Sequence, residues 1–170
     1  MSTQVSYAHW LLGYGRARDR YTTAEAHHRD EAGEEYWVLF GDPERPRQVI
    51  QVSERHLDYL VVWLDEELRE VLTYLFVPVD KENPQDFSKG LFLEQVHFKE
   101  YDSPDLDSAF PSRAGGTYFE HDGSAFHVQN LGNGREESET GPMDPAEAQR
   151  LLFEPHPTFG DWTSIARRDR

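Results

Sequence analysis

The strongest periodic pattern of hydrophobic residues lies between residues 54 and 75. At the roughly 100° per residue of an α-helix, one stripe collects Leu57, Leu60, Val61, Leu64, Leu68, Val71, Leu72 and Leu75. Charged residues fall outside this stripe. Ser53 precedes the pattern at the position of a helix N-cap, where a hydroxyl accepts from first-turn N–H groups. The pattern predicts one long amphipathic helix packed on a sheet.

The same segment also permits a β-hairpin. Its strands would be residues 59–64 and 71–79, and its turn residues 65–68. Both strand segments are rich in the β-branched and aromatic residues that strands favour. The turn contains no Gly, Asn or Pro, which tight turns favour, so the helix ranks first. The alternative fold is an all-β meander in which residues 59–79 are a hairpin.

Shorter apolar and aromatic segments predict strands elsewhere. Residues 36–40 and 48–52 flank a Gly- and Pro-containing segment and predict a hairpin with a longer loop. Residues 90–101 have the length and composition of a further strand. Residues 131–141 are polar throughout and predict a surface loop.

The predicted hairpin over residues 117–129 and the last predicted helix each carry a specific local signal. Asp122-Gly123 between residues 117–121 and 124–129 predicts a two-residue turn, because both central positions of that turn need positive φ. Asp144 and Pro145 form a helix start for residues 143–153. We therefore predict an α+β fold in a single domain, residues 1–170, with an antiparallel sheet of about five or six strands, one long amphipathic helix and a short C-terminal helix.

Acidic residues outnumber basic ones throughout the body of the chain. The 170 residues contain 32 Asp and Glu against 17 Lys and Arg, which gives a formal net charge of −15. Residues 1–32 are neutral in sum, whereas residues 33–80 have a net charge of −7. The surplus therefore belongs to a folded surface and not to a detachable acidic tail. Such a surface suits solubility or a salt-rich environment, and it equally suits a basic partner.

Composition excludes several classes of protein. The chain contains no cysteine, which removes disulfides, zinc–thiolate sites and cysteine nucleophiles. No apolar run is long enough to cross a bilayer, and the first residues lack the pattern of a secretory signal, so we expect a cytoplasmic protein that does not bind membranes. The negative charge opposes direct binding to nucleic acid. Motifs for phosphate, dinucleotide and metal binding are missing, and we expect no cofactor and no metal.

One group of residues suggests acid–base chemistry. If Asp122-Gly123 is the two-residue turn of the hairpin over residues 117–129, Tyr118 lies directly opposite His127, and Glu120 lies on the diagonal. A carboxylate that orients an imidazole can raise its basicity. The alternative function is therefore a small enzyme or ligand-binding domain that uses these three residues. The same residues also fit the solvent face of an ordinary antiparallel sheet.

The leading functional hypothesis is a non-catalytic acidic module that binds a basic protein. An immunity-protein or antitoxin-type inhibitor of a toxin is an example of this class. Aromatic residues among acids are typical of binding hot spots, and such residues share the polar flank of the predicted helix. We expect the partner to contact Asp58, Trp63, Asp65, Glu66, Glu67 and Glu70.

Overall fold

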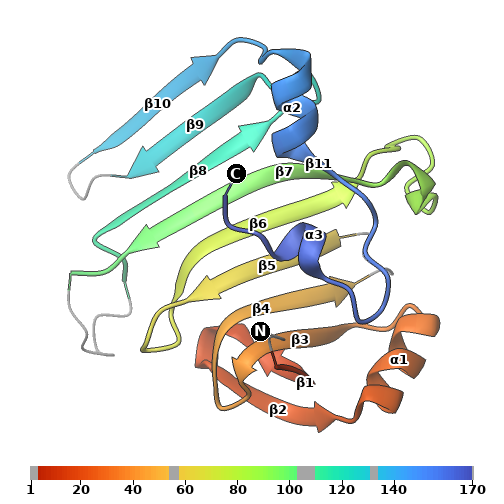
Figure 1. Cartoon of the computed structure of the whole chain (residues 1–170). Coiled ribbons are helices and arrows are strands. Elements are labelled where there is room, and N and C mark those ends of the chain that lie inside the picture. The colour runs from red at the N-terminus through yellow and green to blue at the C-terminus, as the bar shows by residue number, and fades with distance from the viewer. Residues whose placement is uncertain (1–3, 54–57, 103–109, 131–133, 170) are drawn as a thin grey trace.

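A computed structural model describes residues 4–53, 58–102, 110–130 and 134–169. In these ranges the chain forms one antiparallel sheet with three short α-helices (Figure 1). The strands are β1 (Val5–Leu11), β2 (Arg16–Tyr21), β3 (Tyr36–Asp42), β4 (Arg45–Ser53), β5 (Asp58–Leu64), β6 (Glu70–Pro78), β7 (Leu91–Glu100), β8 (Arg113–Phe119), β9 (Ala125–Asn130), β10 (Arg135–Thr140) and β11 (Phe153–Glu154). The helices are α1 (Thr23–Glu31), α2 (Pro145–Leu152) and α3 (Thr163–Ala166), with 3₁₀ turns η1 (Leu12–Tyr14) and η2 (Phe87–Lys89).

The sheet is a meander over most of its width. Its strand order is β10-β9-β8-β7-β6-β5-β4-β3-β1-β2, so consecutive strands from β3 to β10 pair with one another. β11 pairs with the start of β7. The chain is therefore an all-β meander, and the prediction of an α+β fold with one long helix is wrong.

The predicted helix is the β5–β6 hairpin, and residues 54–57 at its predicted start lie outside the described residues. β5 is buried on both faces: Tyr59, Val61 and Trp63 face one hydrophobic cluster, and Val62 and Leu64 face another. A strand buried on both faces is apolar at nearly every position, which hides the alternation that identifies a strand. The hairpin alternative, with its turn at residues 65–68, describes the observed structure.

The C-terminal segment covers the larger of the two clusters. After β10 the chain passes through α2 and β11 and then crosses in front of the sheet to α3 (Figure 1). Leu152, Trp162 and Ile165 are at most 3% exposed and pack with side chains from β3 to β7. The segment is thus a second layer over the face of the sheet.

The smaller cluster lies on the other face, near β1 and β2. Ala8, Trp10, Trp37, Leu39 and Val49 belong to it, and Leu12, Ala17 and Leu68 pack against it. A Cβ added at Gly15, just before β2, would lie 3.0 Å from the Cβ of Leu68 in the β5–β6 turn. Because β2 is four places from β5 in the strand order, this contact shows that the sheet curls around the smaller cluster.

Several shorter predictions are confirmed and others are wrong. Residues 36–40 and 48–52 lie in the β3–β4 hairpin, residues 91–100 form β7, and Asp144 caps α2 by accepting from Ala146 and Glu147 backbone N–H groups at 2.9 and 3.3 Å. The predicted surface loop instead contains β10, whose six residues are all exposed. The sequence reasoning also missed α1, although Thr22 and Glu25 form a capping box there.

No helix in the described ranges is both long enough and apolar enough to span a lipid bilayer.

A half-buried histidine joins the C-terminal segment to the sheet. The Nε2 atom of His156 lies 2.6 Å from the hydroxyl of Tyr59, and its ring packs against Phe87 with a centroid distance of 4.4 Å. Burial lowers the pKa of His156 below its usual value of 6.5, although the Asp30 carboxylate opposes this effect. The folded protein therefore keeps His156 neutral at a pH where the unfolded chain binds a proton.

We predict that acid weakens this attachment. Because the folded pKa of His156 is lowered, its contribution to stability is complete above about pH 6.5 and is lost as the pH falls from there through the folded pKa. Burial lowers the pKa of His97 and His121 as well, so these two residues also make the folded protein less stable as the pH falls. Urea unfolding between pH 5 and 8 should show a smaller acid-induced loss in His156→Gln than in the parent, whereas the exposed control His28→Gln should match the parent. Equal pH dependence in all three proteins would contradict the assignment.

Candidate functional site

Two hollows flank the β5–β6 turn, where β5 ends and β6 begins. The larger has a volume of about 1030 Å³ and lies among the β3–β4 hairpin, the end of β5 and α3. Its lining residues are Phe40, Gly41, Asp42, Arg45, Pro46, Arg47, Gln48, Trp63, Leu64, Asp65, Glu66, Leu68, Thr163, Ala166 and Arg167. Its volume reaches the upper end of the range typical of ligand pockets, roughly 300–1,000 Å³. We name it the turn hollow.

The lining of the turn hollow combines apolar and charged groups. Phe40, Trp63 and Leu64 supply apolar surface, and Trp63 is 8% exposed because its ring packs edge-on against Tyr74 at a centroid distance of 4.6 Å. Three arginines and three acids complete the lining: Arg45, Arg47, Arg167, Asp42, Asp65 and Glu66. An apolar pocket with a few charged groups around it is the usual chemistry of a binding site.

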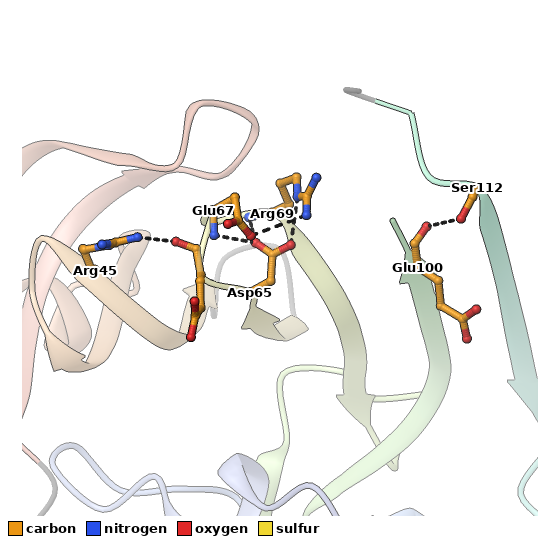
Figure 2. Close-up of polar contacts among 7 residues, drawn as sticks. Arg45, Asp65, Glu67, Arg69, Glu100 and Ser112 are labelled. Carbon is orange, nitrogen blue, oxygen red and sulfur yellow. Dashed lines mark hydrogen bonds and ion pairs between the residues drawn. The ribbon is translucent and has the colours of Figure 1, made fainter. Parts of the chain in front are cut away.

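Asp65 builds the turn between the two hollows (Figure 2). Its Oδ1 atom accepts hydrogen bonds from the backbone N–H groups of Glu67 and Arg69 at 3.0 and 2.8 Å, and its Oδ2 accepts from Arg69 Nε at 2.8 Å. Leu68 adopts a left-handed conformation with φ of 63°. That conformation disfavours side chains other than Gly and Asn, so packing of Leu68 on the smaller cluster and the Asp65 hydrogen bonds hold the turn in this shape.

Two arginines connect other elements to the walls of the turn hollow. Arg45, at the start of β4, donates from Nη2 to the backbone oxygen of Glu66 at 2.5 Å (Figure 2). Arg167, just after α3, donates to Glu154 Oε1 at 2.6 Å and to the backbone oxygen of Arg150 at 2.7 Å. Neither Arg45 nor Arg47 forms an ion pair with any residue in the described ranges, so both remain cations beside the turn hollow.

The second hollow lies on the other side of the turn, between β6 and β7. Its volume is about 730 Å³. Arg69 stacks over the Tyr101 ring at 4.2 Å, and Lys99 Nζ lies 2.8 Å from Glu70 Oε2. Further along this edge, the Ser112 hydroxyl donates to the backbone oxygen of Glu100 at 3.2 Å (Figure 2). The charges around this hollow are thus largely balanced within the chain.

The structure brings together part of the predicted partner-binding set. Trp63, Asp65 and Glu66 line the turn hollow, whereas Glu67 lines the second hollow with Asp65 and Glu66. Asp65 and Glu67 share Arg69, and Glu70 pairs with Lys99, so most of their charge is already compensated within the chain. Asp58 lies at the opposite end of β5. Glu66 is the exposed acid of the set, and its side chain forms no ion pair among the described residues.

The structure does not bring Tyr118, Glu120 and His127 together. The turn has three residues, His121, Asp122 and Gly123, because the Glu120 N–H donates to the Ser124 oxygen and Gly123 has a φ of 80°. This shifts the register by one residue, so Tyr118 pairs with Phe126 and His127 pairs with Thr117. A one-residue shift moves a side chain to the other face of the sheet. His127 Nδ1 instead lies 2.9 Å from the Thr117 hydroxyl.

Many acids have a structural role that the sequence reasoning did not consider. Asp80, Asp86, Asp122 and Asp161 each accept hydrogen bonds from nearby backbone N–H groups in turns. Hydrogen bonds lower the pKa of all four carboxyl groups, led by Lys89 for Asp80, Ser88 for Asp86, Ser124 for Asp122 and Thr163 for Asp161. Asp is a common turn residue for this reason. Part of the acidic surplus is therefore turn chemistry, and it was readable from Gly, Ser, Thr or Asn within three residues after each Asp.

Comparisons with protein-family models, curated proteins and solved structures gave no match to the chain. Among the described residues, no group of three or more His, Asp or Glu side chains is arranged to hold a metal ion. The turn hollow and the charged groups around it are the remaining features that can bind another molecule.

We predict that Asp65 stabilises the turn mainly through its backbone hydrogen bonds. Asp65→Ala should lower the free energy of unfolding by about 1–3 kcal/mol, because two partly buried N–H groups lose their acceptor. Asp65→Asn retains an acceptor oxygen and loses only the ion pair with Arg69, so it should cost less than half as much. Urea unfolding of both variants measures the two costs. Equal losses would instead assign the role to the ion pair.

Proposed function

We propose that this protein is a non-catalytic, cytoplasmic binding module that captures a basic protein and inhibits it, as immunity proteins and antitoxins do. The turn hollow is the observation that carries the proposal. Protein interfaces are dominated by a few anchor side chains that fill well-packed pockets on the partner. A hollow of about 1030 Å³ with Trp63 and Phe40 in its lining offers room for such an anchor.

Two acids beside the turn hollow can receive a basic anchor. Glu66 is exposed and unpaired among the described residues, and Asp42 lies across the hollow from the β5–β6 turn. Arg167 is neutralised by Glu154, whose side chain is 9% exposed. Arg45 and Arg47 remain cations beside the hollow that a basic partner must avoid, which makes the site selective for the position of the partner's charge.

The rest of the surface supports long-range attraction. All three lysines already pair with acids of the same chain, Lys81 with Glu94, Lys89 with Asp80 and Lys99 with Glu70. The net charge of −15 makes the surface negative as a whole, although β2 carries exposed arginines. Complementary charge of this kind accelerates association and loses its effect as salt screens it.

The test begins with co-purification from the native host and uses matched charge reversals. The partner should be a basic protein, and its affinity should fall as NaCl rises from 50 to 500 mM. Glu66→Arg should raise the Kd by about tenfold or more, because it places a cation where the basic anchor enters. Isothermal titration calorimetry measures the Kd.

Glu82→Arg is the matched control, since Glu82 is also exposed and also in a loop, but lies outside the turn hollow. It changes the net charge by the same amount and should alter the Kd by less than about twofold. Equal effects of the two variants on the Kd would show that only the net charge of the protein matters, and not the turn hollow. An acidic partner, or an affinity indifferent to salt, would overturn the proposal.

A further inference from the structure

The two outermost strands of the sheet each have one edge with no strand beside it in the described chain. β2 forms one edge and β10 forms the other, at opposite ends of the sheet (Figure 1). Each strand is six residues long. The outward backbone N–H and C=O groups of such edges are available to a strand from another molecule.

The two edges carry opposite charge. β2 contains Arg16, Arg18 and Arg20 with one Asp, all four of them exposed. β10 contains one Arg with Glu136, Glu137 and Glu139, and all of its residues are exposed. The edge strands therefore have net charges of +2 and −2 in a molecule whose total charge is −15.

Pairing within the chain neutralises only part of these charges. Arg20 pairs with Glu44 of the β3–β4 turn, and Arg135 lies 2.6 Å from Glu137. Arg18 has a more distant contact of 3.8 Å with Asp19. Arg16 on one edge, and Glu136 and Glu139 on the other, form no ion pair with any residue in the described ranges. These side chains can meet charges of another molecule.

Charge decides which edges can pair. Pairing β2 with β2, or β10 with β10, places like charges on adjacent strands, which is destabilising. Pairing β2 with β10 places arginines beside glutamates. We propose that a second copy of this chain joins its β10 to the β2 of the first, so that the sheet continues from one molecule to the next.

Pairing of β2 with β10 determines the form of the assembly and limits its affinity. Because two different surfaces meet, the contact is heterologous and leaves a free edge at each end, which gives open chains of molecules and not a closed dimer. A six-residue edge buries less surface than a standard interface, and the total charge of −15 repels other copies. The association is therefore weak and reversible, with a Kd on the order of 0.1–1 mM. It uses neither hollow and is independent of the proposed basic partner.

Sedimentation velocity of the full chain between 0.05 and 2 mM in 150 mM NaCl tests the proposal. The weight-average mass should rise with concentration. Arg16→Glu/Arg18→Glu makes both edges acidic, and Glu136→Lys/Glu139→Lys makes both edges basic, so each variant alone should stay at the monomer mass. These substitutions leave the Arg20–Glu44 and Arg135–Glu137 pairs intact.

Two further samples separate edge pairing from total charge. The variant with all four changes has the net charge of the parent and complementary edges again, and it should regain concentration-dependent association. Glu31→Lys/Glu82→Lys changes the net charge as much as the β10 variant but at exposed sites outside both edge strands, and it should associate at least as strongly as the parent. A parent that remains monomeric at 2 mM would overturn the proposal. Association of the two same-sign variants at the level of the parent would overturn it too.

Discussion

Burial of one sheet face beneath the C-terminal segment is the interaction on which the rest of the structure depends. A wide meander has apolar side chains on both faces and must cover each of them. On the larger face the cover is the segment that carries Leu152, Trp162 and Ile165, all nearly inaccessible. On the other face the sheet curls, and the β2 end meets the β5–β6 turn. The C-terminal segment and the curl of the sheet together bury both faces of β5.

The turn hollow is a consequence of this arrangement. α3 lies over one part of the sheet, and the β3–β4 hairpin and β5–β6 turn extend around it, which leaves the hollow between them. Gln48 donates from Nε2 to the backbone oxygen of Ala166 at 2.8 Å and ties α3 to β4 beside the hollow. Leu68 accepts an unfavourable backbone conformation in the same turn. Strain of this kind persists where surrounding contacts over-determine the local shape.

Local chemistry was predictable from the sequence, and choices that depend on tertiary context were not. Asp144 marked α2, and the composition of residues 90–101 marked β7. The β5–β6 hairpin was ranked second because no turn-forming residue lies at 65–68, and in the structure Leu68 supplies the left-handed conformation. The register of the β8–β9 hairpin depended on a turn of three residues instead of two. Trp63 and Glu66 line the turn hollow, but the sequence selected them as neighbours on a helix that does not form. Charge and aromatic composition do not show how strands are connected.

Truncation of one buried side chain in the C-terminal segment measures how much this second layer stabilises the sheet. Ile165 is fully buried in the larger cluster, whereas Ser138 is exposed on β10. If the C-terminal segment is the second layer, Ile165→Ala lowers the free energy of unfolding by about 2–5 kcal/mol with one cooperative urea transition, and Ser138→Ala changes it by less than about 0.5 kcal/mol. A loss for Ile165→Ala no larger than that for Ser138→Ala would contradict the account.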